Sequence, residues 1–438
     1  MTEIVIIGAG LAGLSAAYHA RLAGIEHEVY DKEEKPGGLC RSHERGNFLF
    51  DYSGHLLHLK SPYFKDLVRD LLGDNLEVIE RKAFIFSHGV FTRFPFQSNL
   101  YGLPPLVIKE CLLGFVKAYG KNSDLPTSAY ANFREWIVGK LGEGIGRHFM
   151  FPYNEKLWTI LTEELTCEWL SKYIPQPSLE EVFDGTFTDN KTGVGYNATF
   201  WYPKIGGIQS LCDSLALRVP GIRLNEKAIR IRLREKVVEF GSGRSAGYGT
   251  LISTMPLKEL VGILDGPVPQ QVREATARLR HNSVLILNIG VRGTGITDKH
   301  WVYLPEKRFR AYRVGAYANI SPGMVPPGMT SYYVEIAYSG RMSIDKDQVV
   351  DESIEELAEM GFLGSKSDLL IKEVFDVDHA YIIYDADRTQ CRNTIMDFLS
   401  ENFIFSIGRY GNWEYSGMEE AMAQGRRIML PKEVKGRG

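Results

Sequence analysis

The chain has 438 residues, of which 44% are hydrophobic and 24% are charged, and its formal net charge is −3. This length suits two domains better than one core, and the composition is that of a globular protein. The small net charge, without a long basic block, argues against nucleic-acid binding, and no apolar run reaches the roughly 18 residues of a membrane span. We therefore expect a cytoplasmic protein without a membrane span, whose first residues form a strand and not a signal peptide.

Five cysteines are scattered along the chain, at Cys40, Cys111, Cys167, Cys212 and Cys391. Their number is odd, and the sequence has no C-x-x-C or Cys/His spacing typical of a metal site. The sequence therefore predicts reduced cysteines and no bound metal.

The first pattern in chain order is a strand, a glycine-rich turn and a helix. Residues 4–7 are apolar and typical of a buried parallel strand, and Gly8, Gly10 and Gly13 follow as G-x-G-x-x-G. The first glycine permits a tight turn, the second lets a pyrophosphate approach the backbone, and the third lets the helix pack on the strand. The pattern predicts a dinucleotide site with its phosphates at the helix N-terminus.

The next segment indicates which dinucleotide is bound. A second strand over residues 27–30 ends at Asp31, where a carboxylate can accept hydrogen bonds from a ribose. Gly37, Gly38 and Arg41 follow in the sequence PGGLCRS. This continuation resembles flavoproteins of the glutathione-reductase and amine-oxidase type, in which it wraps the FAD. The resemblance implies FAD as the cofactor.

The far end of the chain carries a second strand, glycine turn and helix. Residues 403–407 predict the strand, the turn begins at Gly408 and Arg409, and residues 418–427 predict the helix. In the resembling flavoproteins this segment returns to the FAD, and Arg409 matches an arginine that contacts a cofactor phosphate. The resemblance implies one cofactor site built from both ends, with the substrate region between them.

Between these ends the pattern changes several times. Residues 101–170 have apolar side chains at helical spacing. Residues 204–219 predict a glycine turn and a helix, and residues 222–254 predict short strands that return to the cofactor sheet. Residues 284–337 are rich in strand formers and predict an antiparallel sheet, before a short amphipathic helix over residues 353–360.

We predict an α/β fold in which a Rossmann-like FAD-binding domain of the glutathione-reductase and amine-oxidase type carries two insertions. One insertion is an α-helical region and the other is an antiparallel-sheet substrate domain. The predicted boundaries are 1–95, 205–260 and 395–438 for the discontinuous FAD-binding domain, 96–204 for the helical cap and 261–394 for the substrate domain.

Seven segments across the chain together resemble the UDP-galactopyranose mutases, and the eukaryotic-type enzymes more than the short bacterial ones. They are FDYSGHLLHLKSPYF (50–64), TRFPFQSNL (92–100), FPYNEKLW (151–158), YNATFWYPKIGGIQ (196–209), YLPEKRFRAYR (303–313), HAYIIYD (379–385) and GRYGNWEYSGMEEA (408–421). The letters PYNEKLW and AYIIYD also resemble other amine-oxidase-like proteins, which keeps an oxidoreductase as an alternative.

The resemblance implies a redox-neutral pyranose–furanose interconversion of a nucleotide-diphosphate sugar such as UDP-galactopyranose. In that family N5 of the reduced flavin attacks the anomeric carbon and expels the nucleoside diphosphate, which adds again after the sugar ring has reclosed. The implied cofactor is FAD in its reduced form, with NAD(P)H as a candidate reductant, and the implied partner is the nucleotide sugar. The sequence leaves the oligomeric state open, a homo-oligomer included.

The resemblance also assigns the central site residues. His55 in SGHLLH matches a histidine beside the flavin ring, while Tyr303 and Arg313 match an active-site tyrosine and a diphosphate-binding arginine. A guanidinium fork binds phosphate oxygens in a bidentate manner. Tyr381 and Tyr415 match two tyrosines that contact the diphosphate, to which phenol groups can donate hydrogen bonds without adding charge.

Four further positions either match or depart from the family pattern. Gln97 and Asn197 match polar residues that line the same pocket. Lys172 stands where the family has a second diphosphate arginine, and a lysine keeps the charge but loses the bidentate fork. Trp201 replaces a position that commonly holds an arginine-type residue. These departures put UDP-galactose in question more than the class of chemistry.

Two other classes of function remain. One is an FAD-dependent oxidoreductase of the amine-oxidase or protoporphyrinogen-oxidase type, which would pass a hydride from its substrate to FAD. The other is a flavin-binding protein with a structural or regulatory role. Arg313 and the matched tyrosines favour the mutase, because we expect an oxidase pocket to be apolar or aromatic around the flavin.

Overall fold

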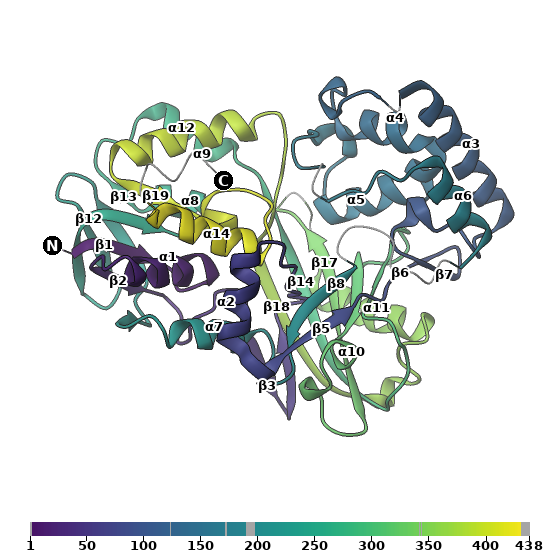
Figure 1. Ribbon diagram of the computed structural model, residues 1–438, viewed down its shortest axis with the longest axis horizontal. Coiled ribbons are helices and arrows are strands. Elements are labelled where there is room, and N and C mark those ends of the chain that lie inside the picture. Colours follow the sequence, from purple (N-terminus) through teal and green to yellow (C-terminus); the bar gives the residue numbers. More distant parts are fainter. Residues whose placement is uncertain are drawn as a thin grey trace.

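The structure is a computed structural model, and it describes residues 2–122, 124–170, 173–189, 198–340, 342 and 344–430. Figure 1 shows a lobe with both described ends of the chain, a group of helices on the opposite side, and a second sheet below them. Across the described ranges, no helix combines the length and the apolar character needed to cross a membrane.

The first sheet contains the N-terminal strand and strands from much later in the chain. Its members are β1 (Thr2–Ile7), β2 (His27–Tyr30), β9 (Ile222–Arg223), β10 (Ala228–Arg232), β11 (Val237–Phe240), β12 (Ser245–Ser253), β13 (Leu264–Asp265) and β19 (Ile404–Ser406). β1 lies between β2 and β12, and β19 pairs with β12, all in parallel. Val5 and Ile6 are both fully buried and belong to cores on opposite faces of the sheet. Burial on both faces explains why this strand reads as one apolar run.

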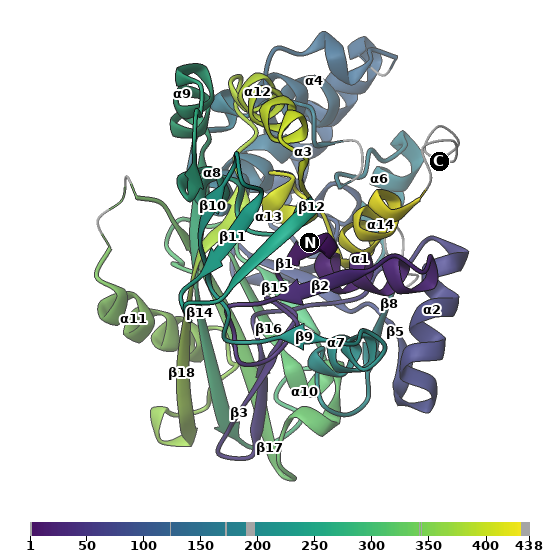
Figure 2. The same cartoon turned by 90° about the vertical axis from the view of Figure 1, so that its left-hand side faces the viewer.

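Helices from the two ends of the chain pack together on one face of this sheet. They are α1 (Leu11–Leu22) and α14 (Met418–Met429), which lie side by side in Figures 1 and 2. A Cβ atom on Gly425 would come within 2.3 Å of the carbonyl oxygen of Ala12, so the approach is as close as glycine allows. Ser15 Oγ donates a hydrogen bond to the carbonyl oxygen of Met422 over 2.7 Å. The predicted return of the C-terminal segment is confirmed, although the expected turn at Gly408 is a short helix, α13 (Gly408–Gly411).

The second sheet is mostly antiparallel and has the strand order β18-β14-β17-β16-β15-β6-β7. Its strands are β6 (Ala83–Ser87), β7 (Val90–Arg93), β14 (His281–Arg292), β15 (Trp301–Tyr303), β16 (Arg313–Ala316), β17 (Met329–Tyr338) and β18 (Leu369–Ile382). The predicted antiparallel sheet is therefore present. It also includes β6 and β7, which fall inside the expected FAD-binding range 1–95, because β6 pairs in parallel with β15.

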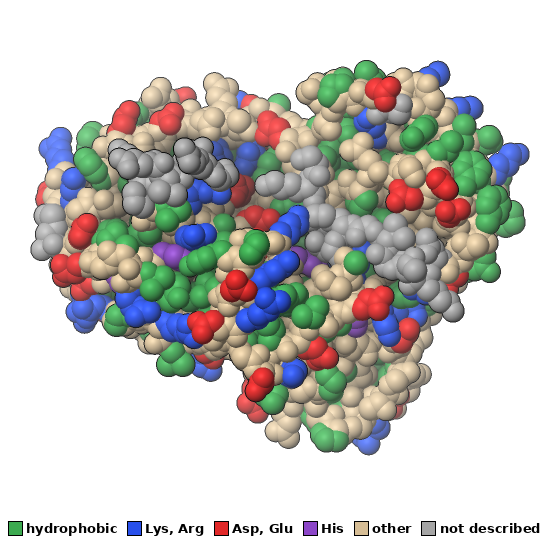
Figure 3. Space-filling model, viewed as in Figure 1, with side chains coloured by type: hydrophobic (Ala, Val, Ile, Leu, Met, Phe, Trp, Pro, Cys, Tyr) green, Lys and Arg blue, Asp and Glu red, His purple; other side chains and the backbone are tan. Residues whose placement is uncertain are grey.

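The helical region contains the four helices α3 (Pro105–Asn122), α4 (Phe133–Ile145), α5 (Phe151–Trp158) and α6 (Leu179–Phe187). α3 and α4 touch through glycines, since a Cβ on Gly142 would lie 2.2 Å from the carbonyl carbon of Gly114. In the space-filling view a notch separates this lobe from the lobe that carries the first sheet, and both signs of charge are scattered over the face (Figure 3).

The remaining described elements connect these parts. They are the helices α2 (Pro62–Leu72), α7 (Gln209–Ala216), α8 (Leu257–Gly262), α9 (Gln270–Arg278), α10 (Tyr317–Ile320), α11 (Lys346–Glu359) and α12 (Arg388–Glu401), with the strand pairs β3 (Ser42–Arg45) and β4 (Phe48–Asp51), and β5 (Leu76–Glu80) and β8 (Thr199–Pro203). The helix predicted over residues 353–360 is the second half of α11, which begins seven residues earlier.

Candidate cofactor and substrate site

The glycine turn after β1 leaves no room for side chains at Gly8 and Gly13. A Cβ on Gly13 would lie 1.9 Å from the carbonyl oxygen of Gly8, and Gly8 itself has a φ of +101°. Gly10 is the N-cap of α1 and forms a parallel bridge with Gly37, while Gly38 lies against its Cα. The backbone of the PGG segment therefore lies beside the N-terminus of α1. Backbone N–H groups at a helix N-terminus are what a phosphate requires.

Asp31 and Arg41 hold this turn in place. Asp31 Oδ2 accepts a hydrogen bond from Ala9 N over 2.5 Å, and its Oδ1 accepts one from Glu33 N over 2.8 Å. Burial raises the pKa of Asp31. Arg41 Nε donates to the carbonyl oxygen of Gly38 over 2.8 Å, and its Nη1 pairs with Glu33 Oε2 at 3.1 Å. The ribose role of Asp31 and the cofactor role of Arg41 stay predictions.

The C-terminal segment meets this turn at the start of α1. Gly408 has a φ of +82°, and a Cβ there would lie 3.0 Å from Cβ of Ala12. The Gly408 N–H donates to Oε1 of Gln424 on α14 over 2.7 Å. Residues from both ends of the chain therefore surround the N-terminus of α1, and Arg409 follows immediately.

A row of functional side chains crosses three strands of the second sheet. Tyr303 on β15 lies opposite Arg313 on β16, which lies opposite Glu335 on β17. Arg313 Nη2 donates to Oε1 of Glu335 over 2.8 Å, and Nε bonds to Oε2, so the contact is bidentate. Glu335 is only 3% exposed and also accepts a hydrogen bond from Ser53 Oγ. No local sequence pattern indicates Glu335, because its partner Arg313 lies 22 residues earlier in the chain.

The contact with Glu335 changes what Arg313 can do. The carboxylate balances the guanidinium charge and occupies Nε and Nη2, which leaves Nη1 outside the bidentate contact. Burial alone would lower the pKa of Arg313, but the neighbouring Glu335 raises it overall, so the guanidinium keeps its charge. Arg313 is therefore a fixed donor rather than an unbalanced positive charge.

Arg409 lies among the predicted diphosphate tyrosines. Its Cζ is 5.1 Å from the ring centroid of Tyr381 and 4.7 Å from that of Tyr415, whose own centroids are 5.8 Å apart. Nη1 donates to the carbonyl oxygen of Ser416 over 2.9 Å and Nη2 to that of Ala380 over 3.1 Å. Burial raises the pKa values of both tyrosines, so at neutral pH their hydroxyl groups are neutral.

Two tyrosines that the sequence analysis does not identify connect this cluster to the strand row, Tyr312, which is buried, and Tyr153, which is partly buried. Tyr312 OH lies 3.3 Å from Tyr381 OH. The Tyr153 ring packs edge-on against Tyr303, with centroids 5.4 Å apart, and against Tyr312 at 6.5 Å. Tyr153 belongs to the FPYNEKLW segment, and Tyr312 directly precedes Arg313, so only their places within matched segments could have identified them.

His55 completes the cluster from the N-terminal half. Its N–H donates to the carbonyl oxygen of Ser53 over 3.0 Å. Burial lowers the pKa of His55 to about 4, and the positive charge of Arg409 contributes in the same direction. The imidazole is therefore neutral at physiological pH. Together His55, Tyr303, Arg313, Tyr381, Tyr415 and Arg409 form what we call the pocket cluster.

Lys156 forms hydrogen bonds with the backbone of the loop between Tyr303 and Arg313. Its Nζ donates to three backbone carbonyl oxygens, those of Leu304, Glu306 and Ala311, over 2.8, 2.6 and 3.1 Å. Burial lowers the pKa of Lys156 to about 7. This contact fixes the loop whose two ends carry pocket-cluster residues.

Arg81 is a further cation beside Tyr303 that sequence reasoning missed. Its Cζ lies 5.2 Å from the ring centroid of Phe94, and this ring packs on Tyr303 with centroids 4.8 Å apart. The arginine therefore approaches the pocket cluster from the side of β6 and β7.

The other predicted site residues make different contacts or lie outside the described residues. Gln97 is buried, and its Nε2 donates to the carbonyl oxygen of Pro175 over 2.8 Å. Trp201 is buried under the guanidinium of Arg69 and bonds through its backbone to Leu57. Lys172 and Asn197 lie outside the described residues. The role of Gln97 in substrate binding stays a prediction, and Trp201 is part of the packing.

Several buried polar atoms around the cluster fit a bound flavin nucleotide. Within the described part of the chain, Arg409 Nε, His55 Nδ1 and Ser416 Oγ are buried without a hydrogen-bond partner. Such atoms are rare in folded proteins and need an explanation. With the glycine turn at one end of the site and these donors at the other, the residues present fit FAD.

Comparisons with known proteins agree with this picture. A family model of NAD(P)-binding Rossmann-like domains matches residues 6–71. A crystal structure of reduced UDP-galactopyranose mutase superposes with a TM-score of 0.90 at 28% identity and covers 98% of this chain and 95% of its own. A protein provisionally assigned as a protoporphyrinogen oxidase from Exiguobacterium sp. 255-15 superposes with a TM-score of 0.74 at 15% identity, with 98% of each chain covered.

Matches by sequence alone are shorter. Mitochondrial protoporphyrinogen oxidase of Nicotiana tabacum is 22% identical over 262 residues, which are 52% of this chain and 50% of the relative. Phytoene dehydrogenase of Streptomyces griseus is 37% identical over 84 residues, or 18% of this chain and 16% of the relative. The chain thus spans no more than half of these curated relatives. Taken with the fold and the glycine turn, the comparisons show a Rossmann-like domain that implies a flavin cofactor, within a fold that a UDP-galactopyranose mutase shares over nearly its whole length.

Proposed function

We propose that the protein is a flavin-dependent mutase that interconverts the pyranose and furanose forms of a nucleotide-diphosphate sugar, with UDP-galactopyranose as the first candidate. The observation that carries this proposal is the likeness to a UDP-galactopyranose mutase over nearly the whole of both chains. The pocket cluster supports it independently, because a diphosphate needs several convergent donors and positive charge.

The residues of the pocket cluster would bind the diphosphate in different ways. Arg409 supplies positive charge beside the hydroxyl groups of Tyr381 and Tyr415, which can donate to phosphate oxygens while they stay neutral. Arg313, with its charge balanced by Glu335, supplies a rigid donor whose position does not depend on the substrate. The leaving diphosphate would therefore be held in place while the sugar changes its ring size.

The flavin, when bound in its reduced form, supplies the nucleophile for the anomeric carbon. The protein's own contribution on that side is His55, whose imidazole is kept neutral by burial. A neutral imidazole can accept or donate one hydrogen bond without adding a charge next to the flavin. The surrounding aromatic rings limit access of water to this end of the pocket.

A second candidate, an FAD-dependent oxidoreductase acting on an amine, is favoured by a different observation. A pocket beside Tyr415, lined also by Trp169 and Tyr384, has three carboxylates on its wall, from Glu168, Glu414 and Glu420. Carboxylates attract an ammonium group and repel a diphosphate. In this alternative the substrate would enter past these glutamates and would reduce the flavin.

The two candidates are distinguished by one anaerobic experiment. The purified protein is prepared with its flavin reduced and is incubated with UDP-galactopyranose, and then with a small panel of UDP-, GDP- and dTDP-sugars. Furanose products are separated by chromatography, while the flavin spectrum is followed. The oxidised protein is incubated in parallel with each sugar, and separately with a panel of amines.

We expect a furanose product only from reduced protein, with no net oxidation of the flavin. Sugar turnover by oxidised protein at the same rate would contradict the mutase. Bleaching of the oxidised flavin by an amine, without any sugar product, would establish the oxidoreductase instead and would make Lys172, the departure from the family pattern, the first residue to exchange for arginine.

A further inference from the structure

The turn over residues 51–55, which we call the His55 turn, contains a residue with an unusual backbone conformation. Ser53 has a φ of +70°, which lies in the left-handed region that favours glycine. Its side chain is only 7% exposed, so the serine is not there to contact solvent. A strained residue persists only where the surrounding structure requires it, and such residues are frequent at active sites.

The hydroxyl group of Ser53 has two partners. Its Oγ donates a hydrogen bond to Oε1 of Glu335, the buried carboxylate that also binds Arg313 in a bidentate contact. The same oxygen accepts a hydrogen bond from the Gly54 N–H over 2.6 Å. A glycine in place of Ser53 would adopt this backbone conformation without strain, but it would lack both contacts. The hydroxyl group is therefore what the serine adds to the turn.

The start of the His55 turn is fixed by other contacts. Asp51 Oδ2 accepts a hydrogen bond from Tyr202 OH over 2.6 Å, and the Asp51 carbonyl oxygen accepts one from Tyr317 OH over 2.8 Å. Among residues 51–55, all of which the structure describes, only Ser53 forms a hydrogen bond with the buried ion pair. The link between the turn and that pair therefore depends on one hydroxyl group.

The turn also lies close against β17, the strand that carries Glu335. A Cβ atom on Gly54 would come within 2.4 Å of Tyr333 OH, and Tyr333 precedes Glu335 by two residues on the same strand. Two consecutive residues of the turn, Ser53 and Gly54, thus contact two side chains of β17. This close approach leaves the turn little freedom to move while the hydroxyl contact is present.

His55 is connected to the same ion pair through Ser53. The His55 N–H donates to the carbonyl oxygen of Ser53 over 3.0 Å, so the serine sets the position of the histidine backbone. Burial lowers the pKa of the imidazole most, and the charges of Glu335 and Arg313 act on it in opposite directions. The histidine that is predicted beside the flavin and the arginine that is predicted at the diphosphate are therefore neighbours.

We propose that Ser53 is a positioning residue of the active site, whose hydroxyl group links the His55 turn to the Arg313–Glu335 pair. This inference rests on the proposed function and extends it to the alignment of the two sides of the pocket cluster. A mutase needs its diphosphate donor and its flavin in one geometry throughout a turnover, and supporting hydrogen bonds provide such a geometry. The strain at Ser53 is the cost of this link.

Two variants separate the hydroxyl group from the backbone conformation. Ser53→Gly removes both the strain and the hydroxyl group, whereas Ser53→Ala removes the hydroxyl group and keeps the strain. Asn47→Gly is the matched control, because Asn47 is exposed, has a φ of +65° and lies in the hairpin turn between β3 and β4. All are prepared as full-length chains with their flavin. In urea unfolding we expect Ser53→Gly to have a higher midpoint than Ser53→Ala.

Hydrogen exchange and the flavin potential test the link without any sugar. Without the hydroxyl group the Gly54 N–H loses its acceptor, so exchange of that amide should be about tenfold faster in both Ser53 variants. The reduction potential of the flavin, measured by equilibration with a reference dye, should shift in the same direction in both. Asn47→Gly should match wild type in both measurements. Equal exchange and equal potential in wild type and Ser53→Gly would overturn the proposal.

Steady-state kinetics connects the link to turnover. With a nucleotide sugar that the wild type accepts, kcat should fall by about tenfold or more in both Ser53 variants, whereas KM should change by less than about twofold. The reason is that Arg313 remains to bind the diphosphate and only its alignment is lost. Wild-type kcat in Ser53→Gly would show that this position needs only a left-handed backbone, and would overturn the proposal. If the wild type converts no nucleotide sugar, the proposed function fails, and the exchange and potential measurements still decide the role of Ser53.

Discussion

The two ends of the active site are built in contrasting ways. At the cofactor end, backbone atoms form the surface, and Gly8, Gly10 and Gly13 matter because they have no side chains. At the substrate end, side chains form the surface, and they come from strands and loops that are far apart in the sequence. The residues of the first kind of site are close together in the sequence, whereas those of the second kind are brought together by the pairing of distant strands.

This contrast predicts different failures when each end is altered. A change at the cofactor end should act through sterics and remove the cofactor altogether. A change at Tyr303 or Arg313, the members of the pocket cluster on the second sheet, should leave the cofactor in place and alter turnover in graded steps. The following predictions test that difference, from the largest expected effect to the smallest.

Gly13→Ala should abolish FAD binding. The new Cβ would lie 1.9 Å from the Gly8 carbonyl oxygen, and neither the strand nor the helix can move without opening the turn. We expect the purified protein to carry no bound FAD, as measured by its flavin absorbance. Gly120→Ala on α3, where nothing lies within 4 Å of the new atom, is the matched control and should keep its flavin. A yellow Gly13→Ala protein would refute the steric account.

Arg313→Ala should retain FAD and lose activity. One hydrogen bond to a charged group contributes about 1.5–3 kcal/mol, so kcat/KM for the nucleotide sugar should fall by about 10- to 150-fold. The control is Arg310→Ala in the same loop, because Arg310 pairs with Glu352 at the surface. Steady-state kinetics under anaerobic conditions measures both. Equal kcat/KM in wild type and Arg313→Ala would remove this residue from the site.

His55 should make stability depend on pH. Its pKa is about 4 in the folded protein and about 6.5 in the unfolded chain, so only the unfolded chain takes up the proton between these values. The free energy of unfolding should fall as the pH falls through this range, by about 2 kcal/mol between pH 7 and pH 5 from this residue.

The measurement is urea unfolding of wild type and His55→Gln at both pH values. The variant should lose about 2 kcal/mol less than wild type on acidification. An identical loss in wild type and His55→Gln would mean that His55 titrates normally in the folded protein.

Lys156→Met should have the smallest effect. Methionine matches the length of the side chain but cannot donate to the three carbonyl groups, so the loop from Leu304 to Ala311 should loosen while Tyr303 and Arg313 stay present. We expect a smaller loss in kcat/KM than for Arg313→Ala, because Tyr303 and Arg313 are misplaced but not removed. Lys307→Met on the exposed side of the loop should change little. A loss as large as that of Arg313→Ala would show that the loop is more than a spacer.

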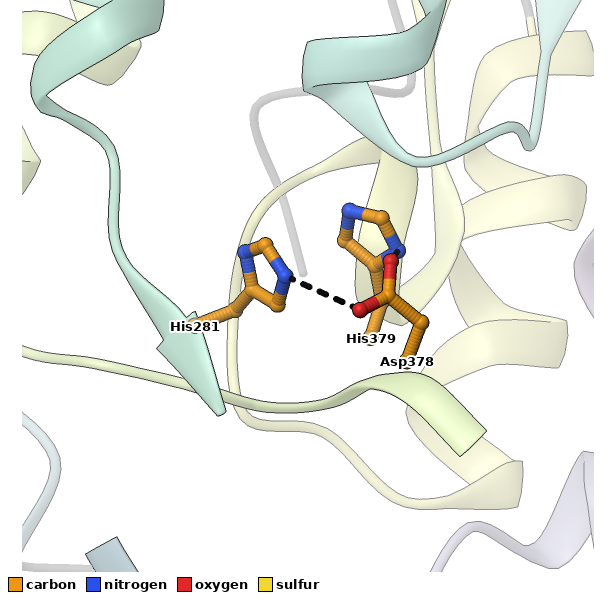
Figure 4. Close-up of side chains that lie close together, drawn as sticks. All are labelled: His281, Asp378 and His379. Atoms are coloured by element: carbon orange, nitrogen blue, oxygen red, sulfur yellow. Dashed lines mark ion pairs between the residues drawn. The ribbon is translucent and has the colours of Figure 1, made fainter. Parts of the chain in front are cut away.

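The same contrast explains how much the sequence could predict. The strand–turn–helix at the start, the C-terminal return and the antiparallel sheet follow from local patterns, and the structure confirms them. Glu335 could not be found in this way, because only the pairing of β16 with β17 places it opposite Arg313. The stacked rings of His281 and His379 are a second case, because only the pairing of β14 with β18 and its register shift bring these two distant residues together (Figure 4).

Side-chain contacts also could not be predicted from the sequence. The resemblance implies a cofactor phosphate as the partner of Arg409, and that role stays a prediction; its packing beside the rings of Tyr381 and Tyr415 is a contact that no spacing rule indicates. Trp201, which departs from the family pattern, is buried, and the inferred effect of that departure on the substrate stays a prediction.

The pairing of α1 with α14 also sets an order of events during synthesis. The glycine turn emerges from the ribosome first, whereas Met422 and Gly425, which close over α1, come roughly 400 residues later. At about 5–20 residues per second, that delay is on the order of a minute. During that time α14 is not yet available to pack on α1 beside the nucleotide-binding turn. A chaperone, or FAD itself, therefore has a defined interval in which to bind the exposed segment.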